Sequence, residues 1–98
     1  MSDTVQAIGH IDNDKVVVTE WRLEPGGETG HHRHERDYVI VPLCDAKLRI
    51  TLPDGSDATA EMKTGQSYFR EAGVEHNVIN ASDHVIAFVE VELRPTGE

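Results

Sequence analysis

Turn-forming residues recur along this chain about every eight to twelve residues, and this spacing restricts the possible folds more than any other feature. Gly, Pro, Asn or Asp stands in each of the segments HIDNDK, EPGGETG, CDAK, PDGSD, KTGQ, EAGVE and NASDH. The stretches between them are short and rich in Val, Ile, Thr and aromatic residues, and none keeps helical apolar spacing over about ten positions. The sequence therefore predicts an all-β chain with little helix.

Residues 46–52 carry the clearest strand pattern, because apolar residues alternate there with polar ones. One face of this strand should be buried and the other should face water. About eight antiparallel strands in so short a chain favour a β-barrel or jelly roll, which protects the edges of its sheets. We expect a single domain over residues 1–98, with its core at about residues 15–93 and a short polar tail at 94–98.

Charge and composition exclude several classes of protein. The net charge is −9, from 18 acidic residues against nine Lys and Arg, and such a surface repels nucleic acids and anionic membranes. The longest apolar runs, VIVPLC and VIAFV, are much shorter than the roughly 20 residues of a membrane span. MSDTVQAIGH resembles no secretory leader, and the lone Cys44 has no partner for an intrachain disulfide. We expect a cytoplasmic protein that binds neither nucleic acid nor membrane.

Histidines provide the most specific chemical signal. His32 and His34 are two positions apart, so in a strand they point to the same face with Cα atoms roughly 6.6 Å apart. Two imidazoles at that spacing can share a metal ion, and His76 in GVEHNVIN is the best candidate for a third ligand. Three imidazoles and an open position are typical of a catalytic metal site. The alternative is a solvated histidine loop at a barrel mouth.

Two motifs resemble those of the cupins. The first cupin motif, G-x5-H-x-H, is matched by Gly26, His32 and His34. The second motif, G-x5-P-x-G-x2-H-x3-N, is matched in spacing by Gly65, Gly73, His76 and Asn80. The resemblance implies a cupin-type antiparallel β-barrel, that is, a double-stranded β-helix or jelly roll. The chain also resembles the small single-domain cupins called β-alanine degradation proteins, which would imply a role near the catabolism of small amino or keto acids.

Three positions depart from the cupin motifs. Tyr38 stands where many cupins place a glutamate ligand, Asp45 replaces a glycine and Glu71 replaces a proline. The first departure implies either a site of three histidines or a site that has lost affinity for metal, and Asp37 does not simply replace the glutamate because it faces the opposite side of the strand. Tyr38 shares the parity of His34, so we expect its hydroxyl beside the metal as a candidate catalytic group. The alternative is an aromatic residue that fills the barrel interior.

Further residues bear on the ligand and the assembly. Arg22 and Arg36 are candidates for binding a substrate carboxylate, and surface ion pairs are the alternative. Asn80 is expected to cap backbone groups at the end of the His76 strand. Apolar outer faces and edge strands predict a homodimer.

Three functions remain open at this point. The first is a metalloenzyme acting on a small polar metabolite through one divalent transition metal, namely iron, zinc, nickel, copper or manganese. Dioxygenase, isomerase and decarboxylase are the reaction types that the cupin resemblance suggests. The second is a non-catalytic cupin that binds or senses a metabolite, and the third is a metal-free structural module, against which the three histidines weigh.

Overall fold

Nine strands in two antiparallel sheets form the structure of residues 4–95, the part of the chain that the computed structural model describes. The five-stranded sheet has the order β1-β2-β9-β4-β7, with bounds Val5–Asp12, Val16–Leu23, Ile86–Leu93, Tyr38–Pro42 and Tyr68–Arg70. The four-stranded sheet has the order β3-β8-β5-β6, with bounds His32–Arg33, Glu75–Asn80, Ala46–Thr51 and Asp57–Met62. The expected all-β fold of about eight strands is confirmed. Residues 96–98 of the expected polar tail lie outside the described residues.

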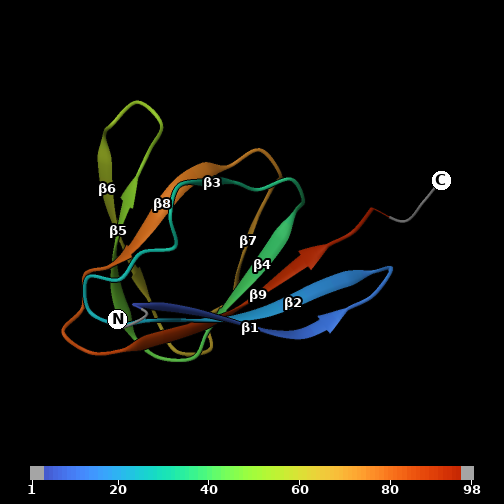
Figure 1. Cartoon of the computed structure of the whole chain (residues 1–98), viewed down its shortest axis with the longest axis horizontal. Coiled ribbons are helices and arrows are strands. Elements are labelled where there is room, and N and C mark those ends of the chain that lie inside the picture. Colours follow the sequence, from blue (N-terminus) through green and yellow to red (C-terminus); the bar gives the residue numbers. More distant parts are fainter. Residues whose placement is uncertain (1–3, 96–98) are drawn as a thin grey trace.

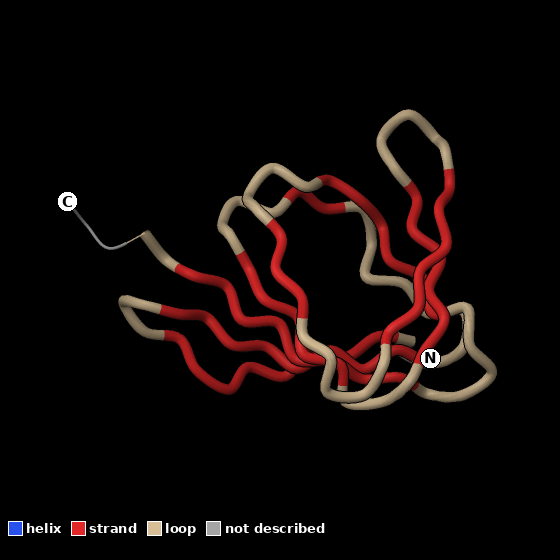
Figure 2. Tube along the Cα trace, turned by 180° about the vertical axis from the view of Figure 1, so that it is seen from behind, coloured by secondary structure: helices blue, strands red, loops and turns tan. Residues whose placement is uncertain are grey.

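The two sheets wrap around a common interior, as the traces in Figures 1 and 2 show. Strands from opposite ends of the chain pair over their whole length, since Val16 lies opposite Leu93 and Leu23 lies opposite Ile86. β1 precedes the core expected over residues 15–93 and adds an edge strand to β2. Only strands and loops occur among the described residues, so none of them form a helix that could cross a membrane. This arrangement is the jelly-roll barrel that the turn spacing predicted.

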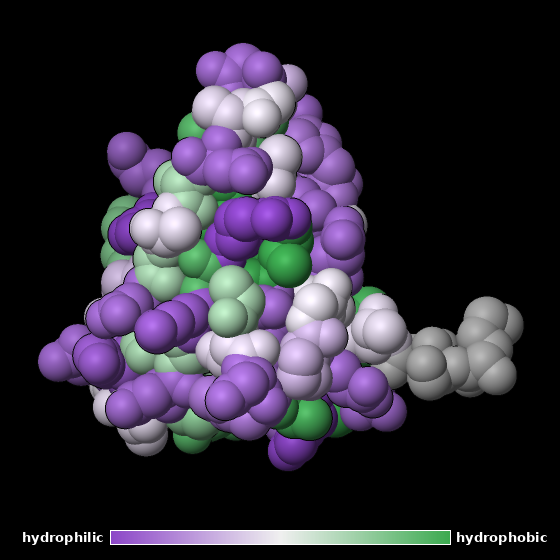
Figure 3. All heavy atoms as spheres, turned by 90° about the vertical axis from the view of Figure 1, so that its left-hand side faces the viewer, coloured by the Kyte–Doolittle hydropathy of each residue, from purple (hydrophilic) through white to green (hydrophobic). Residues whose placement is uncertain are grey.

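Period-two alternation places the core. In β5, Ala46 and Leu48 are buried while Lys47 and Arg49 are exposed, as predicted. Leu52 was expected on the buried face but is 38% exposed, because β5 ends at Thr51 and the chain turns there. From the side of β5 and β6, hydrophilic side chains predominate around a few apolar ones (Figure 3). The four-stranded sheet therefore turns a mainly polar surface to water.

Asn80 ties β8 to the five-stranded sheet. Its side-chain amide is 1% exposed and donates to the carbonyl oxygens of Leu23, at 3.0 Å, and His84, at 2.8 Å. Its side-chain oxygen accepts a hydrogen bond from the backbone N–H of Ser82 at 2.8 Å. The predicted capping role is confirmed, and the three bonds fix the end of the strand that carries His76.

One apolar row crosses the outside of the five-stranded sheet. Its members lie directly opposite one another on successive strands, in the order Ile11, Val18, Val91, Val39 and Phe69. We call these residues the outer apolar row. Ile11 is 47% and Phe69 is 50% exposed, and the three valines between them are partly exposed. No described part of the chain covers this row, although aliphatic surface of this kind favours burial.

Candidate metal centre

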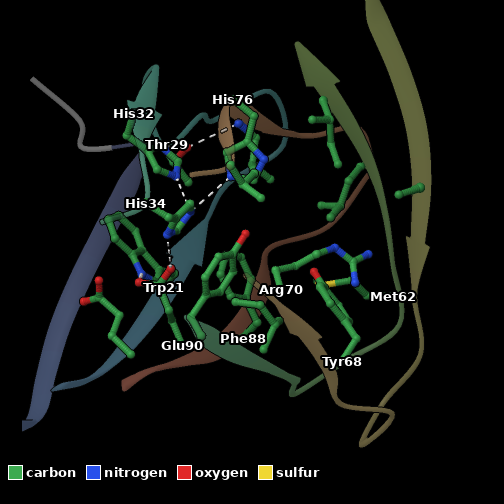
Figure 4. Close-up of a pocket in the computed structure, with 18 of the residues that line it drawn as sticks. Trp21, Thr29, His32, His34, Met62, Tyr68, Arg70, His76, Phe88 and Glu90 are labelled. Atoms are coloured by element: carbon green, nitrogen blue, oxygen red, sulfur yellow. Dashed lines mark hydrogen bonds and ion pairs between the residues drawn. The ribbon is translucent and has the colours of Figure 1, made fainter. Parts of the chain in front are cut away.

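The three predicted histidines meet inside the barrel (Figure 4). His32 on β3 lies directly opposite His76 on β8, so the two side chains share one face of the sheet. His34 follows β3, and its backbone N–H donates to the carbonyl of Val74 at 2.8 Å. The carbonyl of His34 accepts from the N–H of Gly73, also at 2.8 Å. These bonds continue the ladder beyond β3 and keep His34 in phase with His32.

Their Nε2 atoms converge on one point. The Nε2 atom of His34 lies 2.9 Å from that of His32 and 3.2 Å from that of His76. The three ligand atoms all lie within 4.8 Å of one another. A metal with bonds of about 2.0–2.1 Å to imidazole sets neighbouring ligand atoms roughly 2.9–3.4 Å apart, for bond angles between about 90° and 109°. The two separations that involve His34 therefore fit a shared metal ion, and the His32 and His76 nitrogens lie within 4.8 Å of each other.

The position of the ring proton on His32 supports the same fit. Its Nδ1 atom lies 2.8 Å from the carbonyl oxygen of Gly30, and because a carbonyl only accepts, this nitrogen carries the proton. The Nε2 atom of a neutral His32 then presents a lone pair to His34. One proton on the Nε2 atom of His34 satisfies one neighbour only, whereas a cation satisfies all three rings. The donor set is that of a divalent transition metal.

Gly30 orients His32 through an unusual backbone conformation. Its φ is +87°, in the left-handed region that glycine adopts most readily. The backbone N–H of Gly30 donates to the side-chain oxygen of Asn77 at 2.9 Å, which ties this turn to β8. With the turn fixed, the Gly30 carbonyl points at Nδ1 of His32 and leaves Nε2 for a metal.

A buried glutamate supports His34 from the opposite side. Glu90 on β9 is 8% exposed, and its Oε2 atom lies 3.6 Å from Nδ1 of His34. Its other oxygen accepts a hydrogen bond from the indole N–H of Trp21 at 3.2 Å. Burial raises the pKa of the Glu90 carboxyl above its usual range. Glu90 therefore lies where it can orient the imidazole of His34 through Nδ1.

Burial keeps two of these imidazoles neutral. It lowers the pKa of His34 to about 4, and the charges of His32 and His76 act in the same direction. Burial likewise lowers the pKa of His76 to about 4, with further contributions from His32, His31 and Arg70. Both groups therefore lack a competing proton at neutral pH, which is the state that a metal ligand needs.

Tyr38 packs against the three histidines through His34. The ring of Tyr38 stacks on that of His34, with centroids 3.9 Å apart and an interplanar angle of 17°. Burial, together with the charges of Tyr68 and Glu90, raises the pKa of the Tyr38 hydroxyl to about 12. A hydroxyl with this pKa keeps its proton at neutral pH and donates a hydrogen bond more readily than it binds a metal. Tyr38 lines the cavity beside the histidines.

The two arginines expected to bind substrate lie in different places. Arg22 follows Trp21, which faces the cavity, so the alternation of the strand directs Arg22 outward. Its Nε atom donates to Glu20 at 2.7 Å on that outer face, and the structure does not bring Arg22 to the cavity. Arg36 does line the cavity, where its guanidinium pairs with Glu92 at 3.7 Å.

Glu90 and Arg70 are among the charged residues of the cavity that sequence reasoning missed. Glu90 had a signal, since AFVEVEL places it in phase with Phe88 and Ile86, which are both buried. Arg70 had none, because its position depends on the pairing of β7 with β4, where it lies opposite Tyr38.

The cavity itself has a volume of about 570 Å³. Charged groups and the histidines occupy part of its wall, and the rest is apolar. The main apolar members are Ile40, Leu48, Ile50, Met62, Val78 and Phe88. A pocket of this size, with a few convergent polar groups in an apolar wall, suits a small organic ligand.

Comparison with known proteins agrees with this geometry. The family model described as Cupin domain matches residues 19–92. The beta-alanine degradation protein BauB of Pseudomonas aeruginosa is 55% identical over 96 residues, which cover 96% of this chain and 100% of that protein. The match spans all three histidines, both sheets and the cavity.

Solved structures show the same fold. A cupin domain from Bordetella pertussis Tohama I superposes with a TM-score of 0.90 at 47% identity, over 97% of this chain and 98% of that chain. The polyketide cyclase RemF from Streptomyces resistomycificus superposes with a TM-score of 0.74 at 26% identity, over 94% of this chain and 66% of that chain. The chain belongs to the cupin family.

Proposed function

We propose that this cupin is a metal-dependent enzyme that acts on a small polar metabolite. The observation that carries the proposal is the convergence of the three Nε2 atoms, two pairs of which lie 2.9 and 3.2 Å apart, within the cavity. His32, His34 and His76 would hold one divalent transition metal, drawn from iron, zinc, nickel, copper and manganese. Such a metal supplies an electrophilic centre that binds or polarises a polar group of the substrate.

The surrounding residues have distinct tasks in this proposal. Gly30 and Glu90 fix the orientation of two imidazoles through their Nδ1 atoms. Tyr38 keeps its hydroxyl proton and donates a hydrogen bond to a ligand beside His34. Apolar side chains of β4, β5 and β9 exclude water, which strengthens each polar contact inside the cavity.

The substrate class follows from chemistry and from a relative. The name of the Pseudomonas aeruginosa protein places that protein in the degradation of beta-alanine, a small amino acid. We propose that this chain also acts on a small amino or keto acid of that kind, with Arg36 available at the cavity wall. We expect the reaction in the cytoplasm, where the lone Cys44 stays reduced.

The test combines metal analysis with a search for turnover. The protein is purified without an immobilised-metal column, its metal content is measured, and small amino and keto acids are screened with the identified metal. We expect about one metal per chain and turnover that stops on chelation and returns with the metal. A metal-free protein with no affinity for these metals would contradict the proposal. Tight metabolite binding without turnover would instead favour the alternative, a non-catalytic binding or regulatory cupin.

We further propose that a second copy of the chain covers the outer apolar row, which gives a homodimer. The row crosses all five strands, and its ends at Ile11 and Phe69 are about half exposed. On the same face, Glu20 and Arg22 form an ion pair at 2.7 Å. The Glu20 side chain is 12% exposed and the Arg22 side chain is 47% exposed. A face with an apolar centre and a charged pair beside it can match a copy of itself across a twofold axis.

A further inference from the structure

Arg70 is the unpaired cation of the cavity. The other two arginines of the wall have acidic neighbours, since Arg33 lies 3.7 Å from Glu35 and Arg36 lies 3.7 Å from Glu92. Among residues 4–95, no carboxylate lies within salt-bridge distance of the Arg70 guanidinium. Arg70 lines the cavity from an exposed position, and in a chain with a net charge of −9 a cavity arginine without an acidic partner among the described residues is a feature that an anionic ligand would explain.

The guanidinium of Arg70 is held in place by its own surroundings. One of its terminal nitrogens donates to the carbonyl oxygen of Phe69 at 2.9 Å, and its plane lies over the Tyr68 ring, 4.6 Å from the centroid. The edge formed by Nε and the second terminal nitrogen has no partner among the described residues. That edge presents two parallel N–H donors, the geometry that a carboxylate accepts.

Arg70 is also connected to the three histidines through Tyr38. It lies directly opposite Tyr38 in the pairing of β4 with β7, and Tyr38 stacks on His34. Arg70, Tyr38 and His76 all line the same cavity. Figure 4 shows the Arg70 side chain extending into the cavity on the side away from His32 and His34.

We infer that the cavity binds a short aliphatic carboxylate, with its carboxylate on the free edge of Arg70 and a second polar group directed toward the three histidines. This inference deepens the proposed function, and only the second contact rests on it. Apolar residues of the cavity wall, Met62 and Phe88 among them, are available to contact the carbon chain of this ligand. Arg36 is a weaker anchor because Glu92 already neutralises it.

The experiment compares acids with their uncharged amides. The probes are glycolate, 3-hydroxypropanoate and 4-hydroxybutanoate, each paired with its amide, and they are titrated into nitrogen-15-labelled protein in zinc-loaded and chelator-treated forms. The readout is the NMR signal of the Arg70 Nε–H group together with the dissociation constant. We expect at least one acid to shift this signal and to bind about ten-fold or more tightly than its amide.

Variants of the arginines test which of them binds the carboxylate. Arg70→Gln should weaken binding of that acid about ten-fold or more. Arg70→Lys should have an affinity for the acid between those of wild type and Arg70→Gln, because the charge stays but the paired donors do not. Arg22→Gln is the matched control outside the cavity and should leave the dissociation constant unchanged. Equal affinities for every acid and its amide, or an Arg70→Gln variant that binds as wild type does, would overturn the inference.

Chelator-treated protein separates this inference from the proposed function. The preference for acid over amide should persist without metal, since it arises at Arg70. A protein that takes up no metal but keeps the preference would refute the proposed function and support the carboxylate site. A preference that disappears with the metal would assign the carboxylate to the histidines and overturn the inference.

Discussion

The two faces of the five-stranded sheet differ more than any other two regions of the molecule. Along each strand, neighbouring residues separate onto opposite faces, so Tyr38 and Glu90 face the cavity while Val39 and Val91 face outward. The inner face carries the aromatic and charged side chains of the cavity, whereas the outer face carries the outer apolar row. The usual pattern of a polar exterior over an apolar interior is thus reversed in part of this sheet.

This reversal separates two roles. On the inner face, Glu90 has partners inside the barrel in Trp21 and His34. No described residue packs over the apolar side chains of the outer apolar row. A change on the inner face should therefore alter ligands and leave the assembly intact, and a change on the outer face should do the opposite.

The largest expected effect comes from removing one histidine. His76→Ala should lower the affinity for zinc by more than the roughly 10–100-fold that loss of an outer-shell partner causes, because it deletes a metal ligand. The dimer should remain. Titration with zinc and a competing chelator measures the affinity, and His31→Ala is the control, since His31 is exposed and pairs with Glu75 at 3.0 Å. Stoichiometric zinc retained by His76→Ala at wild-type affinity would refute the role assigned to that residue.

The next largest effect should come from a charge placed in the outer apolar row. Val91→Asp puts a carboxylate at the centre of the row, between Val18 and Val39, and should weaken self-association on the order of a hundred-fold. Zinc binding should stay as in wild type. Light scattering should give twice the 10.9 kDa chain mass for wild type and the single mass for the variant. Thr59→Asp adds the same charge on exposed β6 and should remain dimeric, and an unchanged Val91→Asp dimer would place the interface elsewhere.

A smaller effect on zinc affinity is expected from changing Glu90, whose carboxylate lies beside His34. Glu90→Gln keeps the acceptor for Trp21 but removes the carboxylate beside His34, and it should lower zinc affinity about ten-fold. Glu92→Gln changes the same group on the same face, but Glu92 pairs with Arg36, so its zinc affinity should match wild type. Equal zinc affinities for both variants would argue against an orienting role for Glu90.

The smallest effect should come from the Tyr38 hydroxyl. Tyr38→Phe keeps the ring that stacks on His34 and removes one hydrogen-bond donor. It should leave zinc affinity unchanged and weaken ligand binding or turnover roughly two- to ten-fold. Zinc titration and ligand titration on the same sample separate the two properties. Loss of zinc from Tyr38→Phe would show that the phenol is a ligand after all.

Much of this site could be read from local patterns. The parity of His32 and His34 needs only the period of a strand, and the spacing of the second motif pointed to His76. Buried and exposed positions in β5 followed from alternation in the same way. Local signals sufficed there because each feature lies within a few residues of sequence.

Features set by long-range pairing could not be read in this way. Alternation says that Trp21 and Arg22 face opposite sides, but only the packing of β2 against the barrel shows which of them faces inward. Arg70 enters the cavity because β7 pairs with β4, a contact that no short motif encodes. The outer apolar row is similar, since its five members come from five strands.

The coordination of the metal tests the central claim most directly. X-ray absorption spectroscopy on the protein loaded with one equivalent of zinc should show three imidazole nitrogens at about 2.0–2.1 Å, and His34→Ala should lose one of them. A spectrum with fewer than three imidazoles, or one that His34→Ala leaves unchanged, would contradict a centre built from His32, His34 and His76.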